Sequence, residues 1–201
     1  QICKKNDVLF VLDEIATGFG RLGSMVEYQS QKSIPDIVSF GKMLTGGYQT
    51  FAATLTTKKI NDSFLGEFSE FKHLFHGHTY TGNPTAAALS LKNLELYEKY
   101  HLIKKIQKTS NVFENRINDI SNLDIVGEIR HKGMVMGIEL VKNKKSNKSL
   151  SSKISMNKLV FEEGRKHQIY FRTLGNIIML VPPLAISQKD LNFLIDGTIS
   201  T

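Results

Sequence analysis

The feature that most constrains the fold is a short apolar run that ends in two carboxylates. Residues 8–12 are all apolar, and Asp13 and Glu14 follow them directly. A run this short, rich in branched and aromatic residues, is typical of a parallel strand buried on both faces. Open α/β sheets bind their ligands at the carboxyl ends of such strands. The sequence therefore predicts an α/β protein in which Asp13 stands at a ligand-binding edge.

A second apolar run, residues 37–40, ends in the same way and leads to Gly41 and Lys42. An acid and an amine are thus expected at two neighbouring strand ends. A lysine becomes nucleophilic near neutral pH when burial or a nearby cation favours loss of its proton, and glycines let a flat ligand approach the backbone. Ile15 would point the same way as Asp13 in an extended chain and could cover one face of that ligand. The alternative is an ordinary ion pair between Asp13 and Lys42, with glycines that only mark turns.

The rest of the chain divides into two parts by its pattern. A strand over 51–57 and a helix over 58–68 precede a polar, aromatic loop, and Pro84 opens a long amphipathic helix that continues to about Ile120, with a break near Tyr100-His101. Short strands and helices then alternate, and Ser187 is the expected N-cap of the last helix. We therefore expect residues 1–105 to belong to a large, mostly parallel-sheet domain and residues 106–201 to form a small C-terminal α+β domain.

Charge and composition restrict the partners. The chain has 201 residues and a net charge of +7, but its lysines are spread along the sequence with few aromatic residues among them. This pattern favours solvated faces over a nucleic-acid surface. No apolar run approaches the roughly 20 residues of a membrane span. The single cysteine, Cys3, excludes an internal disulfide framework and suits a reducing compartment. We expect a cytoplasmic protein without nucleic-acid or membrane partners.

Three histidines in the aromatic loop, His73, His76 and His78, raise the question of a metal site. Imidazoles are common zinc ligands, but no Cys, Asp or Glu follows them at ligand spacing. No metal site is predicted.

Three stretches together resemble the class III, or ω-type, aminotransferases of the type I pyridoxal phosphate fold. They are LDEIATGFGRLG (12–23), PDIVSFGKMLTGGY (35–48) and FHGHTYTGNP (75–84). The last two, with residues 126–144 and 171–184, are most similar to the biotin-pathway branch of that family. The resemblance covers essentially the whole chain, which corresponds to the C-terminal half or more of such an enzyme.

The resemblance implies a role for each matching residue around pyridoxal 5'-phosphate. Lys42 would bond to the cofactor and then move a proton between the substrate carbon and the cofactor. Asp13 would pair with the ring nitrogen, and Ile15 would pack on the ring. Thr79 would bind the cofactor phosphate in the partner subunit's site. From the sequence alone, Thr79 could instead cap the helix that begins at Pro84.

The substrate would contact Lys42, Gly77, His78 and Arg172 in the same comparison. Arg172 would hold the substrate carboxylate, which a planar bidentate donor suits better than a lysine. Its place between apolar neighbours predicts a partly buried guanidinium that needs a partner.

The activity implied is ping-pong transfer of an amino group from S-adenosylmethionine or lysine to 8-amino-7-oxononanoate, by a homodimer. The alternatives are another class III enzyme, acting on ornithine, 4-aminobutyrate or a similar amine, or a truncated non-catalytic descendant. The family's glycine/serine phosphate loop and several pocket aromatics would lie upstream of Gln1. We therefore expect the 201 residues by themselves to be inactive and to bind the cofactor weakly or not at all.

Overall fold

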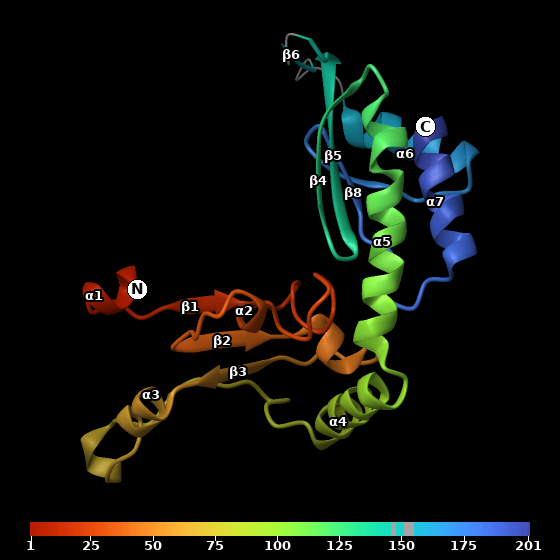
Figure 1. The fold of residues 1–201 in the computed structure, drawn as a ribbon. Coiled ribbons are helices and arrows are strands. Elements are labelled where there is room, and N and C mark those ends of the chain that lie inside the picture. Colours follow the sequence, from red (N-terminus) through yellow and green to blue (C-terminus); the bar gives the residue numbers. More distant parts are fainter. Residues whose placement is uncertain (146–147, 151–154) are drawn as a thin grey trace. The chain divides into compact units, whose positions relative to one another are not determined.

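The computed structural model describes residues 1–145, 148–150 and 155–201, which form two compact units (Figure 1). Unit 1 comprises Gln1–Phe19 and Ser24–His101, and unit 2 comprises Gly20–Gly23 and Leu102–Thr201. Four residues from the N-terminal part of the chain thus pack with the C-terminal part.

Unit 1 is built on a three-stranded sheet in the order β1-β2-β3. Strand β1 (Val11–Asp13) runs parallel to β2 (Ile37–Phe40), and β2 pairs antiparallel with β3 (Ala53–Thr56). The prediction that the two apolar runs form neighbouring parallel strands is confirmed. Asp13 lies in register with Ser39, two residues before Gly41. Because the two strands are parallel, Asp13 and Gly41 come at the same edge of the sheet.

The apolar run that precedes Asp13 is less buried than its composition predicted. Val8, Leu9 and Val11 are 58%, 54% and 57% exposed, whereas Val38 in the next strand is buried. Strand β1 is the edge of the three-stranded sheet and pairs on one side only. The alternation of side chains along a strand also places Val11 and Asp13 on the face opposite Leu12. The expectation of burial on both faces is therefore wrong for this strand.

The helices of unit 1 are short except for the last. They are α1 (Ile2–Lys5), α2 (Glu27–Ser30), the 3₁₀ turns η1 (Lys42–Thr45) and η2 (Phe68–Glu70), α3 (Lys58–Ser63) and α4 (Pro84–Lys99).

Helix α4 begins at an asparagine cap. The Asn83 side chain accepts hydrogen bonds from the backbone N–H groups of Thr85 and Ala86, at 3.0 and 3.2 Å. The cap is therefore Asn83, and the capping alternative for Thr79 is wrong. The helix ends at Lys99, and His101 has a φ of +49°. The predicted break near residues 100–101 is confirmed.

Unit 2 packs helices against an antiparallel sheet in the order β4-β5-β8-β7, with β6 paired to β5. The strands are β4 (Val126–Lys132), β5 (Val135–Asn143), β6 (Lys148–Ser149), β7 (Arg172–Leu174) and β8 (Ile177–Leu180). The helices are α5 (Leu102–Ser121), α6 (Met156–Lys166) and α7 (Gln188–Ser200).

The core of unit 2 follows the helical period of α5. Ile106, Phe113 and Ile120 are spaced by seven residues, so they form one stripe along the helix, and each is at most 1% exposed. Met134 and Met136 are fully buried in the same unit and belong to its core.

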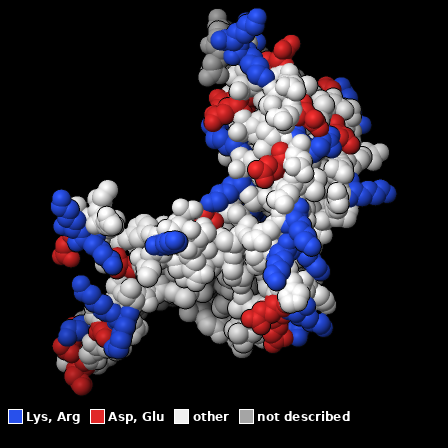
Figure 2. All heavy atoms as spheres, in the orientation of Figure 1, with Lys and Arg blue, Asp and Glu red and all other residues white. Residues whose placement is uncertain are grey.

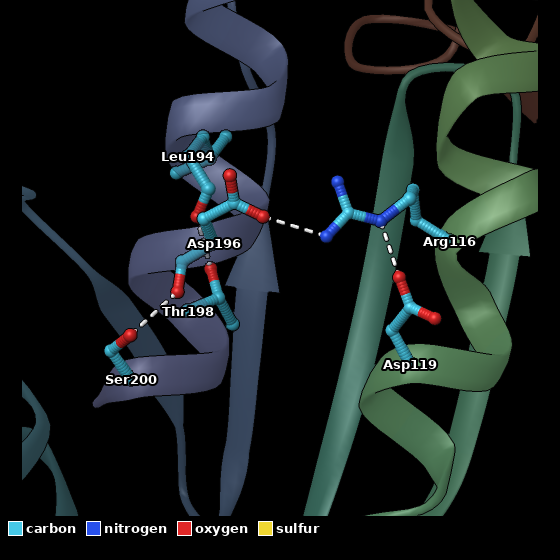
Figure 3. Close-up of polar contacts among 6 residues, drawn as sticks. All are labelled: Arg116, Asp119, Leu194, Asp196, Thr198 and Ser200. Atoms are coloured by element: carbon cyan, nitrogen blue, oxygen red, sulfur yellow. Dashed lines mark hydrogen bonds and ion pairs between the residues drawn. The ribbon is translucent and has the colours of Figure 1, made fainter.

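Helices α5 and α7 lie side by side in unit 2 and are joined by an ion-pair bridge (Figures 1 and 3). Arg116 of α5 pairs with Asp119 one turn along its own helix and with Asp196 of α7, the latter at 2.6 Å. Hydrogen bonds to Asp196 and then to Asp119 raise the pKa of Arg116 above its ordinary value. At the start of α7, Ser187 Oγ accepts from the backbone N–H of Asp190 at 3.1 Å, which confirms the predicted N-cap.

On the face drawn in Figure 2, Lys and Arg side chains lie over both units and alternate with Asp and Glu. Among the helices that the structure describes, none has the length and apolar composition needed to cross a membrane.

Candidate active site

A hollow of about 600 Å³ lies in unit 1 beside the ends of the two parallel strands. Its size is within the range of small-molecule sites. Most of its lining comes from two segments, namely the Lys42 turn with the chain after it and the loop before helix α4, and Ile15, after β1, completes it. The lining residues are Ile15, Gly41, Lys42, Gln49, Thr50, Phe51, Ala52, His78, Tyr80, Thr81, Gly82 and Asn83.

Lys42 enters this hollow from a strained backbone position. It is the first residue of η1, its side chain is exposed, and its φ is +43°, a value that a residue with a Cβ rarely adopts. The buried Gly41 before it packs closely on Ile15, because a Cβ built at position 41 would lie 3.3 Å from Ile15 Cγ2. The glycine therefore lets an apolar side chain lie directly beside the backbone that carries the amine.

Asp13 lies at the end of β1, two residues before Ile15. Its Oδ1 accepts a hydrogen bond from the backbone N–H of Ile15 at 2.9 Å, and the residue is exposed. Asp13 does not line the hollow, although Ile15 does. Asp13 and Lys42 form no ion pair with each other. The alternative that they are an ordinary ion pair is therefore wrong for this structure.

Glu14 supports the loop that follows Asp13. It is 3% exposed, and its carboxylate accepts hydrogen bonds from the Thr17 hydroxyl at 3.0 Å and from the backbone N–H groups of Glu27 and Tyr28 at 3.0 and 2.7 Å. The two backbone donors belong to the first turn of α2, where unpaired N–H groups favour an anion. Glu14 thus holds the loop that follows Asp13 against the first turn of α2.

The loop that contains Gly77, His78 and Thr79 is shaped by its own polar atoms. The backbone N–H of His78 donates to Thr81 Oγ1 at 2.9 Å, and the backbone N–H of Tyr80 donates to His78 Nδ1 at 3.1 Å. Gly77, His78 and Thr79 are all exposed. Of these three residues only His78 lines the hollow.

Arg172 lies on the other unit. It is the first residue of β7, an edge strand of the unit 2 sheet, whereas every lining residue of the hollow belongs to unit 1. Arg172 is exposed, so the expectation of a partly buried guanidinium is wrong. The apolar neighbours Phe171 and Ile169 are themselves buried, and the strand's alternation turns the arginine outward from them.

Several lining residues were not predicted from the sequence. Gln49 to Ala52 follow the turn at Gly46-Gly47, whose φ values of +63° and +86° reverse the chain toward the hollow. The Gly46-Gly47 pair was the sequence signal from which this turn, and the residues after it, could have been predicted. Asn83 immediately before Pro84 was a second, since Asn is a favoured N-cap and Pro a favoured first helical residue. In the part of the chain that the structure describes, no group of three or more His, Cys, Asp or Glu side chains could hold a metal ion.

The residues present fit pyridoxal phosphate. A free primary amine, Lys42, stands in a hollow of sufficient volume, with the apolar side chain of Ile15 against the same backbone. A carboxylate, that of Asp13, lies at the end of the neighbouring strand β1. These are the groups needed to bond an aldehyde, cover a flat ring and hold a proton on a ring nitrogen.

The fold and the site define a class of protein, and the comparisons agree with it. Residues 1–200 match the family model for class III aminotransferases, so the chain belongs to that family. The family depends on pyridoxal phosphate. The predictions of the class III family and of its type I fold are confirmed.

Among individual relatives, the adenosylmethionine-8-amino-7-oxononanoate aminotransferase of Methanocaldococcus jannaschii is 45% identical over 199 residues, which is 97% of this chain and 43% of that protein. A crystal structure of that enzyme matches with a TM-score of 0.91 and 44% identity, over 98% of this chain and 46% of the other. Gamma aminobutyrate transaminase 3 of Solanum lycopersicum is 32% identical over 96% of this chain and 37% of that protein. The chain thus spans less than half the length of these relatives.

Proposed function

We propose that this chain is part of a pyridoxal phosphate-dependent aminotransferase that converts 8-amino-7-oxononanoate into 7,8-diaminononanoate in biotin biosynthesis. The observation that carries the reaction class is the exposed amine of Lys42 in a hollow whose wall includes Ile15. The substrate assignment rests on similarity to the Methanocaldococcus jannaschii enzyme, at 45% identity over 97% of this chain.

Lys42, Asp13 and Ile15 would act on the cofactor. When bound, the cofactor supplies an electron sink for the substrate carbon. Lys42 Nζ would hold the cofactor between turnovers and carry the proton when an amine displaces it. The Asp13 carboxylate would keep the ring nitrogen protonated, and the Ile15 side chain would exclude water from one ring face.

The second group of residues would bind phosphate and substrate. Thr79 offers a hydroxyl and a backbone N–H in an exposed loop, which suits a phosphate in the partner subunit's site. Gly77 and His78 would lie against the substrate beside it. The exposed guanidinium of Arg172 is free to pair with the substrate carboxylate in bidentate geometry.

The assembly we propose is a cytoplasmic homodimer. An exposed aromatic group in unit 1 supports the dimer, since large exposed apolar patches mark interfaces. Phe68, Phe71 and Phe75 gather around His73 and are 79%, 67% and 73% exposed, and Tyr80, further along the same loop, is 73% exposed. We place residues 75–84 at the interface. The cytoplasm is supported by the unpaired Cys3. Units 1 and 2 would be part of the large domain and the small C-terminal domain.

The experiment follows amination of 8-amino-7-oxononanoate by the full-length protein that contains these residues. S-adenosylmethionine and lysine are tested as separate donors. Lys42→Ala should lower kcat by at least about 10²–10⁴-fold, the range expected for loss of a proton-transfer group, while Asn61→Ala on the exposed helix α3 should not. An active Lys42→Ala protein contradicts the catalytic assignment. Failure to aminate the acceptor with either donor contradicts the substrate.

A second candidate is an aminotransferase for 4-aminobutyrate or a similar amine. The Solanum lycopersicum relative, at 32% identity, supports it. The same assay with 4-aminobutyrate as donor and a small keto acid as acceptor distinguishes the two. Activity here, together with none on 8-amino-7-oxononanoate, favours the second candidate.

A further inference from the structure

The strained backbone conformation of Lys42 requires contacts with neighbouring residues that stabilise it. A non-glycine residue at positive φ costs on the order of 1–3 kcal/mol and persists only where the surroundings fix it. Lys42 is in this region with a φ of +43°, at the start of a single 3₁₀ turn. One such turn has too few internal hydrogen bonds to impose this conformation alone.

Helix α4 supplies the missing contacts through one side chain. Asn93 Nδ2 donates to the backbone carbonyl of Met43 at 2.7 Å and to that of Leu44 at 3.2 Å. These are the two residues directly after Lys42, and they lie 50 and 49 positions before Asn93 in the sequence. The Met43 carbonyl also accepts from the backbone N–H of Gly46 at 3.1 Å, so Asn93 adds a second hydrogen bond there. The Leu44 carbonyl lies at the end of the turn, where carbonyls have no partner within the turn, and Asn93 supplies one.

The amide of Asn93 can be oriented in only one way. Its Oδ1 lies on the side of Gly46, where a built Cβ would approach it to 3.2 Å. Reversing the amide would set Oδ1 against the two carbonyl oxygens, which are acceptors like itself. The position is also unusual for a polar residue. Ala86, Ser90 and Tyr97 are buried and, with Asn93, follow a spacing of four, three and four along the inward stripe of α4.

We propose that Asn93 is a positioning residue for Lys42, holding the turn so that the amine points into the hollow. This inference rests on the proposed function. Asn93 does not line the hollow and touches no reacting atom. Ten residues earlier, Asn83 caps the same helix and does line the hollow. Helix α4 therefore anchors both walls of the site, one at its N-cap and one at Asn93.

The test compares Asn93→Ala and Asn93→Asp with Lys92→Ala, an exposed neighbour on the same helix, in the full-length protein. Alanine favours a helix over asparagine, so Asn93→Ala should not unfold α4. We expect kcat to fall about 10- to 100-fold, the scale of a displacement of about 1 Å, with KM changed less than about twofold. The Asp variant should be the weaker enzyme, because a carboxylate repels the two carbonyls. Lys92→Ala should keep wild-type kcat.

A second readout needs no cofactor. The amides of Leu44 and Gly46 donate within the Lys42 turn, to Gly41 and Met43, and should exchange hydrogen at least about tenfold faster in Asn93→Ala. If hydrogen exchange is unchanged in Asn93→Ala, or if it is faster while kcat is unchanged, the positioning role of Asn93 is overturned. The proposed function still stands in that case, provided that the wild-type protein is active. An inactive wild-type protein refutes the proposed function and, with it, this inference.

Discussion

At the scale of single residues, the buried carboxylate of Glu14 carries the clearest prediction. It accepts three hydrogen bonds, two of them from the backbone of α2. In Glu14→Gln one oxygen becomes an NH₂ group that faces hydrogen-bond donors, so at least one partly buried donor loses its partner. We expect the free energy of unfolding to fall by roughly 1.5–3 kcal/mol, measured by urea denaturation of the full-length protein.

The control for Glu14→Gln is Glu95→Gln on α4. Glu95 is exposed and pairs with Lys92 on the surface, so the same chemical change should cost less than about 0.5 kcal/mol. Equal effects of the two substitutions would contradict the role given to Glu14.

At the scale of elements, Arg116 joins α5 to α7 (Figure 3). The side chain is 27% exposed and its two carboxylate partners are more exposed, so the bridge should contribute only about 0.5–1 kcal/mol. The partners raise the pKa of Arg116 above its ordinary value, so this stability is fully present below that value and is lost only as pH rises through the raised one. Between about pH 6 and 9 it should be constant.

A double-mutant cycle measures this bridge. Arg116→Ala, Asp196→Ala and the double variant are compared by thermal unfolding at two pH values and two salt concentrations. The coupling free energy should shrink at high salt, because exposed pairs are screened, and stay constant with pH. A coupling that changes with pH over this range would contradict the assignment to Arg116.

What the sequence could predict was set by local pattern. The strands ending at Asp13 and Phe40, the break at His101 and the Ser187 cap follow from short-range signals, and each is present in the structure. The site around Lys42 was predictable because Asp13, Ile15 and Lys42 lie close together in the sequence, each at or just after the end of a strand. The link from Asn93 to Met43 was not, because it spans fifty residues and leaves no local signal. The exposure of Arg172 depends on which strand forms a sheet edge, a tertiary property.

At the scale of the whole molecule, the chain enters unit 2 twice. The segment Gly20–Gly23 belongs to unit 2, although both of its flanks belong to unit 1. Arg21 donates to the carbonyls of Met134 and Pro182 at 3.3 and 2.6 Å, and its own carbonyl accepts from the N–H of Met134 at 2.9 Å. The stability of unit 2 should therefore depend on the chain that follows Asp13 and Ile15.

Two matched glycines test that dependence. Gly133 and Gly175 both lie in turns between antiparallel strands of unit 2, with φ values of +59° and +60°. A Cβ at Gly175 meets nothing within 4 Å, whereas one at Gly133 would lie 2.6 Å from Leu22 Cα and 2.7 Å from the backbone nitrogen of Gly23. Gly175→Ala should cost roughly 1–2 kcal/mol, the ordinary penalty of a side chain at positive φ. Gly133→Ala should cost roughly 1–3 kcal/mol more, because backbone must move. Urea denaturation of both variants measures the difference, and equal costs would mean that residues 20–23 do not hold the β4–β5 turn.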